Sequence, residues 1–169
     1  MLSNTEEILN TFAKTVIRNA KRNLQRKGKN ATRDLSSSLD YELDVNKNSF
    51  SLQFFMLEYG AFVDEGVRGK KSSKKAPQSP FRFKSKMPPR EPIRKWLKVK
   101  GIRGRDKQGR FIKQDSTAFL IQRSIRDYGM KPSLFFTKPF QNAFKNLDEE
   151  LVEAFGLDID EFLEQTINA

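Results

Sequence analysis

The sequence contains no cysteine and no histidine, and it has one tryptophan among 169 residues. Without cysteine there can be no disulfide and no thiolate nucleophile. Without histidine there is no imidazole base, and the usual ligands of zinc and haem are missing. Carboxylates, lysines and hydroxyls are the groups left for chemistry. These absences favour a structural or binding function.

Long apolar runs are also missing, and hydrophobic residues make up only 37% of the sequence. No stretch is long enough to cross a membrane, and the segment from Met1 to Glu7 is acidic where a signal peptide would be basic. We therefore expect a soluble protein that is made in a cytoplasm and has no membrane partner. A chain of this size with so few apolar residues has a large surface relative to its core, as in a subunit that completes its burial against neighbours.

The sequence offers little that could support catalysis. Asp64 and Glu65 are adjacent carboxylates, but they do not predict a metal site, because neighbouring residues on a helix or strand point in different directions. No glycine-rich phosphate loop, serine elbow or zinc-ligand spacing occurs. We expect no enzyme activity, no cofactor and no bound metal.

The N-terminal region has the pattern of a long amphipathic helix. Apolar residues recur at helical spacing from Leu9 to Leu24, Asn4 and Glu7 form a variant of the capping box, and Gly28 follows the last turn. The opposite face is either a solvated helix surface or a surface that lies along phosphates. Its basic residues are Lys14, Arg18, Lys21, Arg22 and Arg26.

A β-hairpin is predicted next. Apolar and polar residues alternate over 41–45, Asn46 to Ser49 supplies a polar turn, and a second apolar strand covers 50–57. This second strand finishes apolar on both faces, so its far end needs cover on two sides. The expected fold class is α+β, with a small, mainly antiparallel sheet packed by long N-terminal and C-terminal helices and with extended basic loops.

The segment from Tyr59 to Gly66 stands between this hairpin and the most basic part of the chain. We expect the chain to leave the sheet at Tyr59 and Gly60 and to form about one helical turn that buries Phe62 and Val63. Gly66 is expected to end that turn, because glycine adopts positive φ at little cost.

The composition of residues 67–80 is typical of a mobile, solvated loop. A short strand is predicted at 81–83, and prolines at 88, 89 and 92 then bracket the start of a helix that ends at Gly101. Trp96 lies on the apolar face of this helix, since its neighbours one turn away are apolar. We expect it to fill a gap in the core or in a subunit interface.

A second hairpin and a further helix follow. Residues 102–112 contain a four-residue turn that ends in Gly109, so a hairpin with a basic tip is predicted. The next helix should be capped by Asp115 or Ser116 and stopped by Gly129. Its predicted inner face consists of Ala118, Ile121, Ile125 and Tyr128.

The C-terminal part begins with an aromatic run bounded by Pro132 and Phe140. Residues 134–136 are predicted to add a strand to the sheet. A helix opened by Thr137 should then carry an apolar ridge as far as Gly156, followed by a short last helix. We therefore expect one α+β domain over 1–156, with a basic loop at 67–92 inserted, and a short helical tail over 157–169.

The aromatic-glycine turn at 59–66, followed by a long variable loop and then by the proline-bounded aromatic run at 132–140, resembles the tail-completion or neck family of tailed bacteriophages. The resemblance extends from about Thr11 to Phe155, and two aromatic segments of an ordinary α+β domain are the alternative interpretation. In that family the first segment is a structural turn, and the resemblance implies this role for Tyr59, Gly60, Phe62, Val63 and Gly66.

The resemblance implies a virion protein that forms a ring with copies of itself in the head–tail connector, as a tail-completion, terminator or neck subunit. Such a ring joins the portal to the tail and lets DNA pass. Its partners would be portal or adaptor proteins and tail proteins, with nonspecific contact to DNA, and it would occupy the host cytoplasm during assembly. Residues 70–75 and 103–110 depart from the family pattern, because both are longer and more basic.

The net charge of +11 is unevenly distributed. No acidic residue lies between Arg68 and Arg90, whereas the chain from Asp148 onward has eight carboxylates and no basic residue. Opposite poles favour head-to-tail contact between copies, and the alternative interpretation is that both are solvated surfaces. The candidate contacts to a partner or to DNA are Arg68, Lys70, Lys71, Lys74, Lys75, Arg105, Lys107 and Arg110. The candidate interface residues are Trp96, Phe135, Phe136, Glu149, Glu150 and Glu153.

Two other functions fit the same sequence. The charge and the phenylalanine-rich strands also suit a stand-alone nucleic-acid-binding protein, which would bind without sequence choice and with steep salt dependence. An assembly factor that is absent from the mature particle is the second alternative. The basic loop itself has three interpretations: a passive surface loop, a clamp on phosphates, or an arm that orders against an acidic protein.

Overall fold

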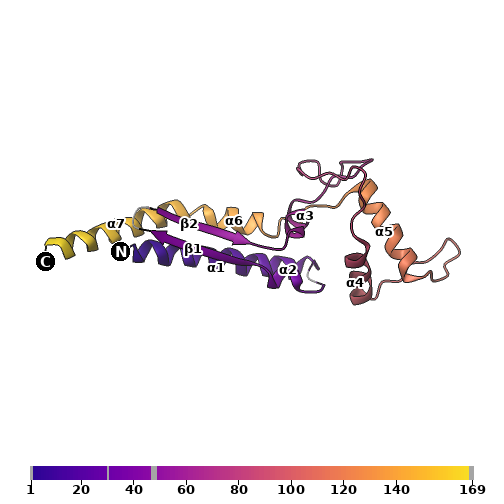
Figure 1. The fold of residues 1–169 in the computed structure, drawn as a ribbon, viewed down its shortest axis with the longest axis horizontal. Coiled ribbons are helices and arrows are strands. Elements are labelled where there is room, and N and C mark those ends of the chain that lie inside the picture. Colours follow the sequence, from indigo (N-terminus) through magenta and orange to yellow (C-terminus); the bar gives the residue numbers. More distant parts are fainter. Residues whose placement is uncertain (1, 30, 47–48, 168–169) are drawn as a thin grey trace. The chain divides into compact units, whose positions relative to one another are not determined.

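The computed structural model describes residues 2–29, 31–46 and 49–167 of the chain. Within these ranges it has seven helices and one two-stranded antiparallel sheet, and the predicted α+β class is confirmed (Figure 1). Two compact units are present. The first comprises Met1–Arg26, Ser36–Leu57 and Phe135–Ala169, and the second comprises Lys27–Leu35 and Glu58–Leu134. A short helix, α2 (Asp34–Ser37), lies where the chain changes from one unit to the other.

The first unit is built on a hairpin of strands β1 (Asp40–Asn46) and β2 (Ser49–Phe55). The strands pair antiparallel, with Asp40 opposite Phe55 at one end and Asn46 opposite Ser49 at the other. Exposed and half-buried residues alternate along β1, because successive side chains of a strand point to opposite faces. The predicted hairpin is confirmed, while its turn residues 47 and 48 lie outside the described residues.

Helix α1 (Ser3–Arg26) is the long N-terminal helix that the sequence predicts. Two helices from the C-terminal part, α6 (Thr137–Phe144) and α7 (Leu147–Ile167), pack along it (Figure 1). Helix α1 also contacts both strands, so the terminal helices and the hairpin enclose one core. The buried residues of α1 follow helical spacing and are Thr5, Leu9, Phe12, Ala13, Val16, Ala20 and Leu24.

Phenylalanine rings join the helices to the hairpin. Phe12 of α1 makes edge contacts with Phe54 of β2 and Phe140 of α6, at centroid distances of 6.3 Å and 5.6 Å. Phe54 also lies 5.3 Å from Phe136. Aromatic pairs in this geometry contribute about 0.5–1.5 kcal/mol beyond area burial. The opposite face of β2 differs, because 45% of Phe55 is exposed and the cover predicted for that face is not supplied by the described residues.

The C-terminal helices break at other positions than the sequence predicts. The expected single helix is divided by a turn at 145–146, and α7 then runs through Gly156 to Ile167. The prediction that Gly156 ends a helix is therefore wrong, and the expected short tail helix is the second half of α7. A glycine inside a helix costs about 1 kcal/mol relative to alanine. The packing of α7 on α1 can offset a cost of that size.

Helix α1 is capped by a residue from the other end of the chain. The carboxylate of Asp158 accepts hydrogen bonds from the backbone N–H groups of Asn4 (2.8 Å) and Thr5 (2.9 Å), and from the Asn4 side-chain amide (3.0 Å). A carboxylate at this position satisfies free N–H groups and interacts favourably with the helix dipole. The predicted cap by Asn4 itself is wrong, because α1 begins at Ser3 and Asn4 acts as a donor.

The second unit contains α3 (Tyr59–Glu65), α4 (Arg90–Lys100) and α5 (Gln114–Tyr128). Helices α4 and α5 pack against each other, and the C-terminal end of α4 is closed by Gly101 in the left-handed conformation, as predicted. Tyr128, which the sequence places on the inner face of α5, is half exposed. The small core between the two helices consists of Ile93, Leu97 and Ala118, with Ile121 and Ile125 beside it.

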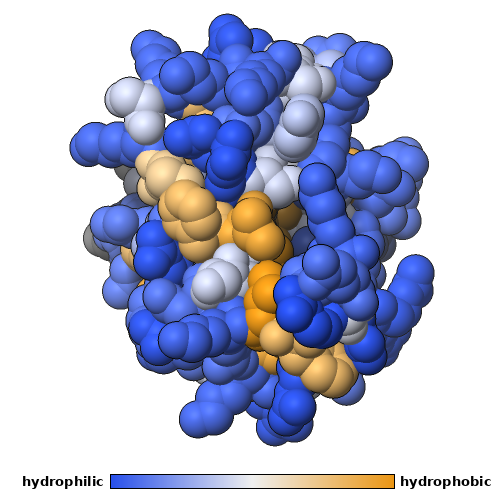
Figure 2. Space-filling model, turned by 90° about the vertical axis from the view of Figure 1, so that its right-hand side faces the viewer, coloured by the Kyte–Doolittle hydropathy of each residue, from blue (hydrophilic) through white to orange (hydrophobic). Residues whose placement is uncertain are grey.

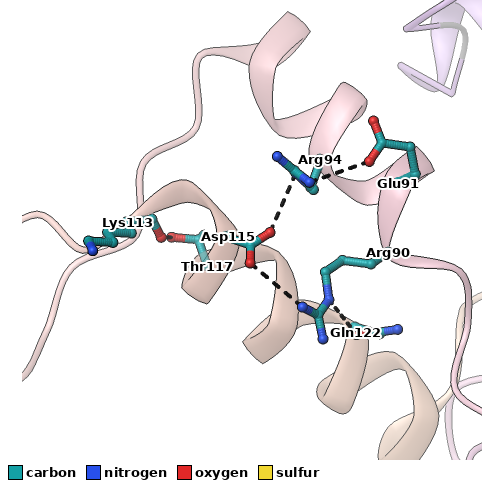
Figure 3. A network of polar contacts seen from close by, with 7 residues as sticks. All are labelled: Arg90, Glu91, Arg94, Lys113, Asp115, Thr117 and Gln122. Carbon is teal, nitrogen blue, oxygen red and sulfur yellow. Dashed lines mark hydrogen bonds and ion pairs between the residues drawn. The ribbon is translucent and has the colours of Figure 1, made fainter.

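A polar network also joins α4 to α5 (Figure 3). The Asp115 carboxylate lies 3.6 Å from Nη1 of Arg90 and 3.5 Å from Nε of Arg94, and Arg90 Nε donates to the Gln122 side chain at 3.2 Å. Asp115 is therefore an ion-pair partner of the neighbouring helix. The prediction that Asp115 or Ser116 caps α5 is wrong, because Lys113 occupies the N-cap position.

The basic segment after Gly66 is held against the end of α5. The backbone N–H groups of Lys70 and Lys71 donate to the carbonyls of Arg126 (2.8 Å) and Asp127 (2.9 Å), and Ala76 is buried. The prediction of a mobile loop is thus wrong for this stretch. Amino-acid composition suggested mobility because it reflects only the polarity of the side chains. The hydrogen bonds that hold this stretch against α5 are made by backbone groups, which composition does not report.

Residues 134–136 do not add a strand to the sheet, which contains β1 and β2 alone among the described residues. Leu134 has a φ of 49°, outside the range of a strand, and Phe135 and Phe136 form a turn that leads into α6. The predicted strand at 81–83 is reduced to an isolated bridge between Arg82 and Arg68.

Candidate functional site

The first of the two segments on which the family resemblance rests contacts the start of the second, residues 132–134, within the second unit; the rest of the second segment, residues 135–140, belongs to the first unit. The backbone N–H of Ser133 donates to the carbonyls of Val63 (3.1 Å) and Asp64 (2.9 Å) at the end of α3, and the N–H of Leu134 donates to Asp64 at 2.9 Å. The Ser133 hydroxyl adds a hydrogen bond to the Val63 carbonyl at 2.6 Å. These bonds satisfy the last carbonyls of α3, which a helix leaves unpaired. We call this contact the α3 junction.

Glycines allow two backbones to approach closely beside the α3 junction. Val67 and Met130 exchange backbone hydrogen bonds of 3.1 Å and 2.8 Å. A Cβ atom on Gly66 would lie 2.6 Å from the Met130 carbonyl, and one on Gly129 would lie 2.1 Å from the Val67 carbonyl. Both glycines have positive φ, of 72° and 74°. The positive φ predicted for Gly66 is confirmed, and Gly129 stops α5 as expected.

The side chains of the aromatic-glycine turn are placed differently from the prediction. Helix α3 buries Gly60 and Asp64, whereas Phe62 is exposed and Val63 is half-buried. The expectation that Phe62 is buried is wrong, and Val63 is buried only in part. Phe62 instead makes an edge contact with Phe81 at 4.7 Å.

Tyr59, the first residue of α3, is also partly exposed. Partial burial raises the pKa of its phenol above the ordinary value, and the negative charge of Asp34 acts in the same direction. Tyr59 is therefore a neutral hydroxyl at physiological pH, and it cannot serve there as an anionic ligand or base.

Several candidate basic contacts already have partners within the second unit. Nζ of Lys71 lies 3.2 Å from the Asp127 carboxylate, which also accepts from Arg126 Nε at 2.8 Å. The hydrogen bond from Arg126, together with that from Lys71, holds the pKa of Asp127 below its usual value. Lys75 Nζ donates to the Gly129 carbonyl at 3.3 Å. These cations stabilise the contact between the basic segment and α5.

Arg68 has a different environment. Its backbone exchanges hydrogen bonds with Phe81 and Phe83, both at 2.9 Å, and its Nε atom is buried without a hydrogen-bond partner in the part of the chain that the structure describes. Lys70, Lys74 and Lys107 have exposed side chains and are the candidate cations best placed to reach another molecule. The sequence does not distinguish these basic residues, whereas in the structure some have partners within the chain, Arg68 is partly buried, and Lys70, Lys74 and Lys107 are exposed.

The basic hairpin predicted at 102–112 is present. Arg105 and Phe111 form an antiparallel bridge, and the guanidinium of Arg105 lies 4.1 Å from the centroid of the Phe111 ring. Asp106 accepts from the backbone N–H of Arg110 at 2.9 Å and pairs with its guanidinium at 2.9 Å. The backbone hydrogen bond from Arg110 is the main reason why the pKa of Asp106 is lowered. Arg105 and Arg110 therefore stiffen the hairpin, and Lys107 is exposed near its tip.

A pocket of about 390 Å³ opens between the C-terminal end of α4 and this hairpin. Leu97, Ile102, Phe111 and Ile112 give it an apolar lining, and Lys98 and Arg103 add positive charge. Sequence patterns did not indicate the pocket, because it forms between a helix and a hairpin that are paired only by the fold. Figure 2 shows one face of the molecule on which an apolar patch is surrounded by hydrophilic residues.

The candidate interface residues fall into three environments. Phe135 is completely buried, so its assignment to a subunit interface is wrong. Phe136 is half-buried and packs on Phe54. Trp96 is 36% exposed, which leaves it at the surface of α4 rather than in the core. The three acidic candidates lie exposed on α7. They are Glu149, Glu150 and Glu153.

The described residues contain no group of acidic side chains that could hold a metal ion. Within the same ranges, no helix has the length and apolar character needed to cross a membrane.

Two structural residues escaped the sequence-based predictions. Asp158 was expected to begin a helix, but it caps α1, and Ser133 was expected to precede a strand, but it caps α3. Both partners lie far away in the sequence, so no local pattern could identify them.

Comparison with protein-family models, curated proteins and solved structures finds no significant match to this chain.

Proposed function

We propose that this chain is a structural subunit of the head–tail connector of a tailed bacteriophage. Copies of the chain would form a ring of the tail-completion, terminator or neck type, which joins the portal to the tail and lets DNA pass. The α3 junction is the observation that carries the proposal. Hydrogen bonds from Ser133 to Val63 and Asp64 support it, because they join the end of the first family-like segment to the start of the second.

The distribution of apolar surface supports a subunit that is completed by neighbours. Half-exposed or exposed apolar side chains occur along α7, from Val152 to Ile167, and on the surface of α4 and α5. Such surface is favourable to bury, at about 25 cal/mol per Å². A ring offers each copy two neighbours against which to bury it.

A nucleic-acid-binding protein is the second candidate, and the exposed Lys70, Lys74 and Lys107 favour it. The other basic candidates favour it less, because Lys71, Arg105 and Arg110 are engaged within the chain. The two functions differ in solution. A monomer retained on DNA at moderate salt supports this candidate, whereas a closed oligomer that does not need DNA supports the connector.

A stop codon early in the reading frame of the phage genome tests the proposed function. Loss of a connector subunit should leave DNA-filled heads and separate tails, and expression of the intact chain from a plasmid should restore tailed particles. A synonymous change at the same codon serves as the control. Infectious tailed particles without the chain would overturn the proposal. Particles that need the chain for assembly but do not contain it would support the assembly-factor alternative instead.

A further inference from the structure

The pocket beside α4 combines an apolar interior with a positive rim. Phe111, one of the lining residues, is 59% exposed, and the guanidinium groups of Arg103 and Arg105 lie 5.8 Å and 4.1 Å from its ring centroid. Lys98 contributes a further cation to the lining. A pocket of this kind fits a segment that carries apolar and acidic side chains together, because the apolar groups fill it and the carboxylates meet the arginines.

The second half of α7 is such a segment. Helix α7 buries Ala154 and Asp158, and it packs on α1. Beyond these positions its apolar side chains are exposed, including 61% of Phe162 and 81% of Ile167. The acidic residues among them are Asp160, Glu161 and Glu164, and no basic residue follows Asp148.

We infer that the second half of α7 from one copy docks in the pocket between α4 and the 102–112 hairpin of a second copy. Each chain then has one acidic-apolar helix to donate and one basic-apolar pocket to accept it. Contact between two different surfaces of identical chains is heterologous, and it closes into a ring when the rotation between copies allows. The inference rests on the proposed function in that it specifies how the copies of the connector ring hold together.

The absence of native cysteine makes disulfide trapping a clean test. One tagged copy carries Glu164→Cys on α7, and a second copy with a different tag carries Gln114→Cys on the pocket lining. Mild oxidation of the mixture should give a disulfide between the two tags at least tenfold more often than a control pair does. In the control, Val152→Cys replaces Glu164→Cys, since Val152 is 74% exposed on the same helix but lies before the docking segment.

Trapping no better than in the control overturns the inference. So does a disulfide that forms only inside a chain carrying both cysteines, because α7 would then dock within its own copy. Competition by short DNA that abolishes the disulfide between differently tagged copies, with retention of monomers on that DNA, also overturns it, since the pocket rim would then be a phosphate site.

Charge reversal provides a second, independent measurement. For this measurement the trapping cysteine on the donating copy is moved from Glu164 to Asp160. Arg103→Glu in the accepting copy should then reduce the trapped fraction about tenfold, and Glu164→Lys in the donating copy should restore it. Loss of trapping without restoration would count against the contact. The failure of the proposed function looks different, because copies would still trap in solution while phage particles form without the chain. If the chain is present in tailed particles but no disulfide forms between copies, the connector role is retained and the proposed contact between α7 and the pocket is rejected.

Discussion

The carboxylate of Asp158 accepts a hydrogen bond from the backbone N–H of Thr5 at 2.9 Å, across 153 residues of sequence. The bond ties the start of α1 to the middle of α7, so the two terminal helices stabilise each other. Asp158→Ala should lower the free energy of unfolding by about 1 kcal/mol, the usual cost of losing a helix cap. Urea unfolding followed by circular dichroism measures this. Asp160→Ala is the matched control, because Asp160 is exposed on the same helix, and an equal loss in both variants would contradict the capping role.

The same contact predicts a pH dependence. Burial alone would raise the pKa of Asp158, but the hydrogen bonds from Thr5 and Asn4 outweigh it, and the pKa is lowered. A carboxyl group whose pKa is lower in the folded state stabilises the fold above its unfolded pKa, about 3.9, and loses that contribution as the pH falls through the folded value. The stability difference between the wild-type protein and Asp158→Asn should therefore be constant from pH 7 to pH 5 and shrink below about pH 4. A difference that is unchanged at pH 3 would contradict it.

Gly129→Ala should open the contact between the basic segment and α5. A Cβ atom at this position would lie 2.1 Å from the Val67 carbonyl, and the φ of 74° is unfavourable for alanine. Gly101→Ala is the control, since its φ of 64° imposes a similar strain of about 1 kcal/mol while no atom lies within 4 Å. Amide hydrogen exchange should show lost protection at Lys70 and Lys71 in the first variant alone. Equal protection in both variants would mean that the close approach is not needed.

Neighbouring phenylalanines of β2 test the core of the first unit. Phe54 packs on Phe12 and Phe136, so Phe54→Ala should cost about 2–3 kcal/mol, somewhat less than for a fully buried ring. Phe55 lies on the other face and is 45% exposed, so Phe55→Ala should cost less than about 1 kcal/mol. Thermal and urea unfolding of both variants decide the matter. Similar losses would show that both faces of the hairpin are packed in solution.

The elements with a periodic pattern could be predicted from the sequence. The stripe from Leu9 to Leu24 and the alternation along β1 report which face is buried, and the structure confirms α1 and the hairpin. Gly101 and Gly129 marked helix ends for a local reason, because each adopts positive φ at that position. Gly156 does not end a helix, although glycine is a poor helix former, because the tertiary packing of α7 can compensate for that preference.

The candidate site was less accessible to prediction because its contacts are made by the backbone and by distant residues. Lys71 looked like a free surface cation, yet Asp127 is its partner at the end of α5. The aromatic character of Phe62 suggested burial, but α3 buries Gly60 and Asp64 instead, and the Phe62 ring is exposed. The pocket beside α4 depends on two elements that meet only in the folded chain.

Locating the chain in phage particles tests the central claim most directly. Antibodies against the full chain, coupled to gold, are applied to purified tailed particles and viewed by electron microscopy, with particles from the stop-codon mutant as the control. A connector subunit predicts gold at the junction of head and tail and nowhere else. Gold that is absent from intact particles, or scattered over heads and tails alike, would contradict the account.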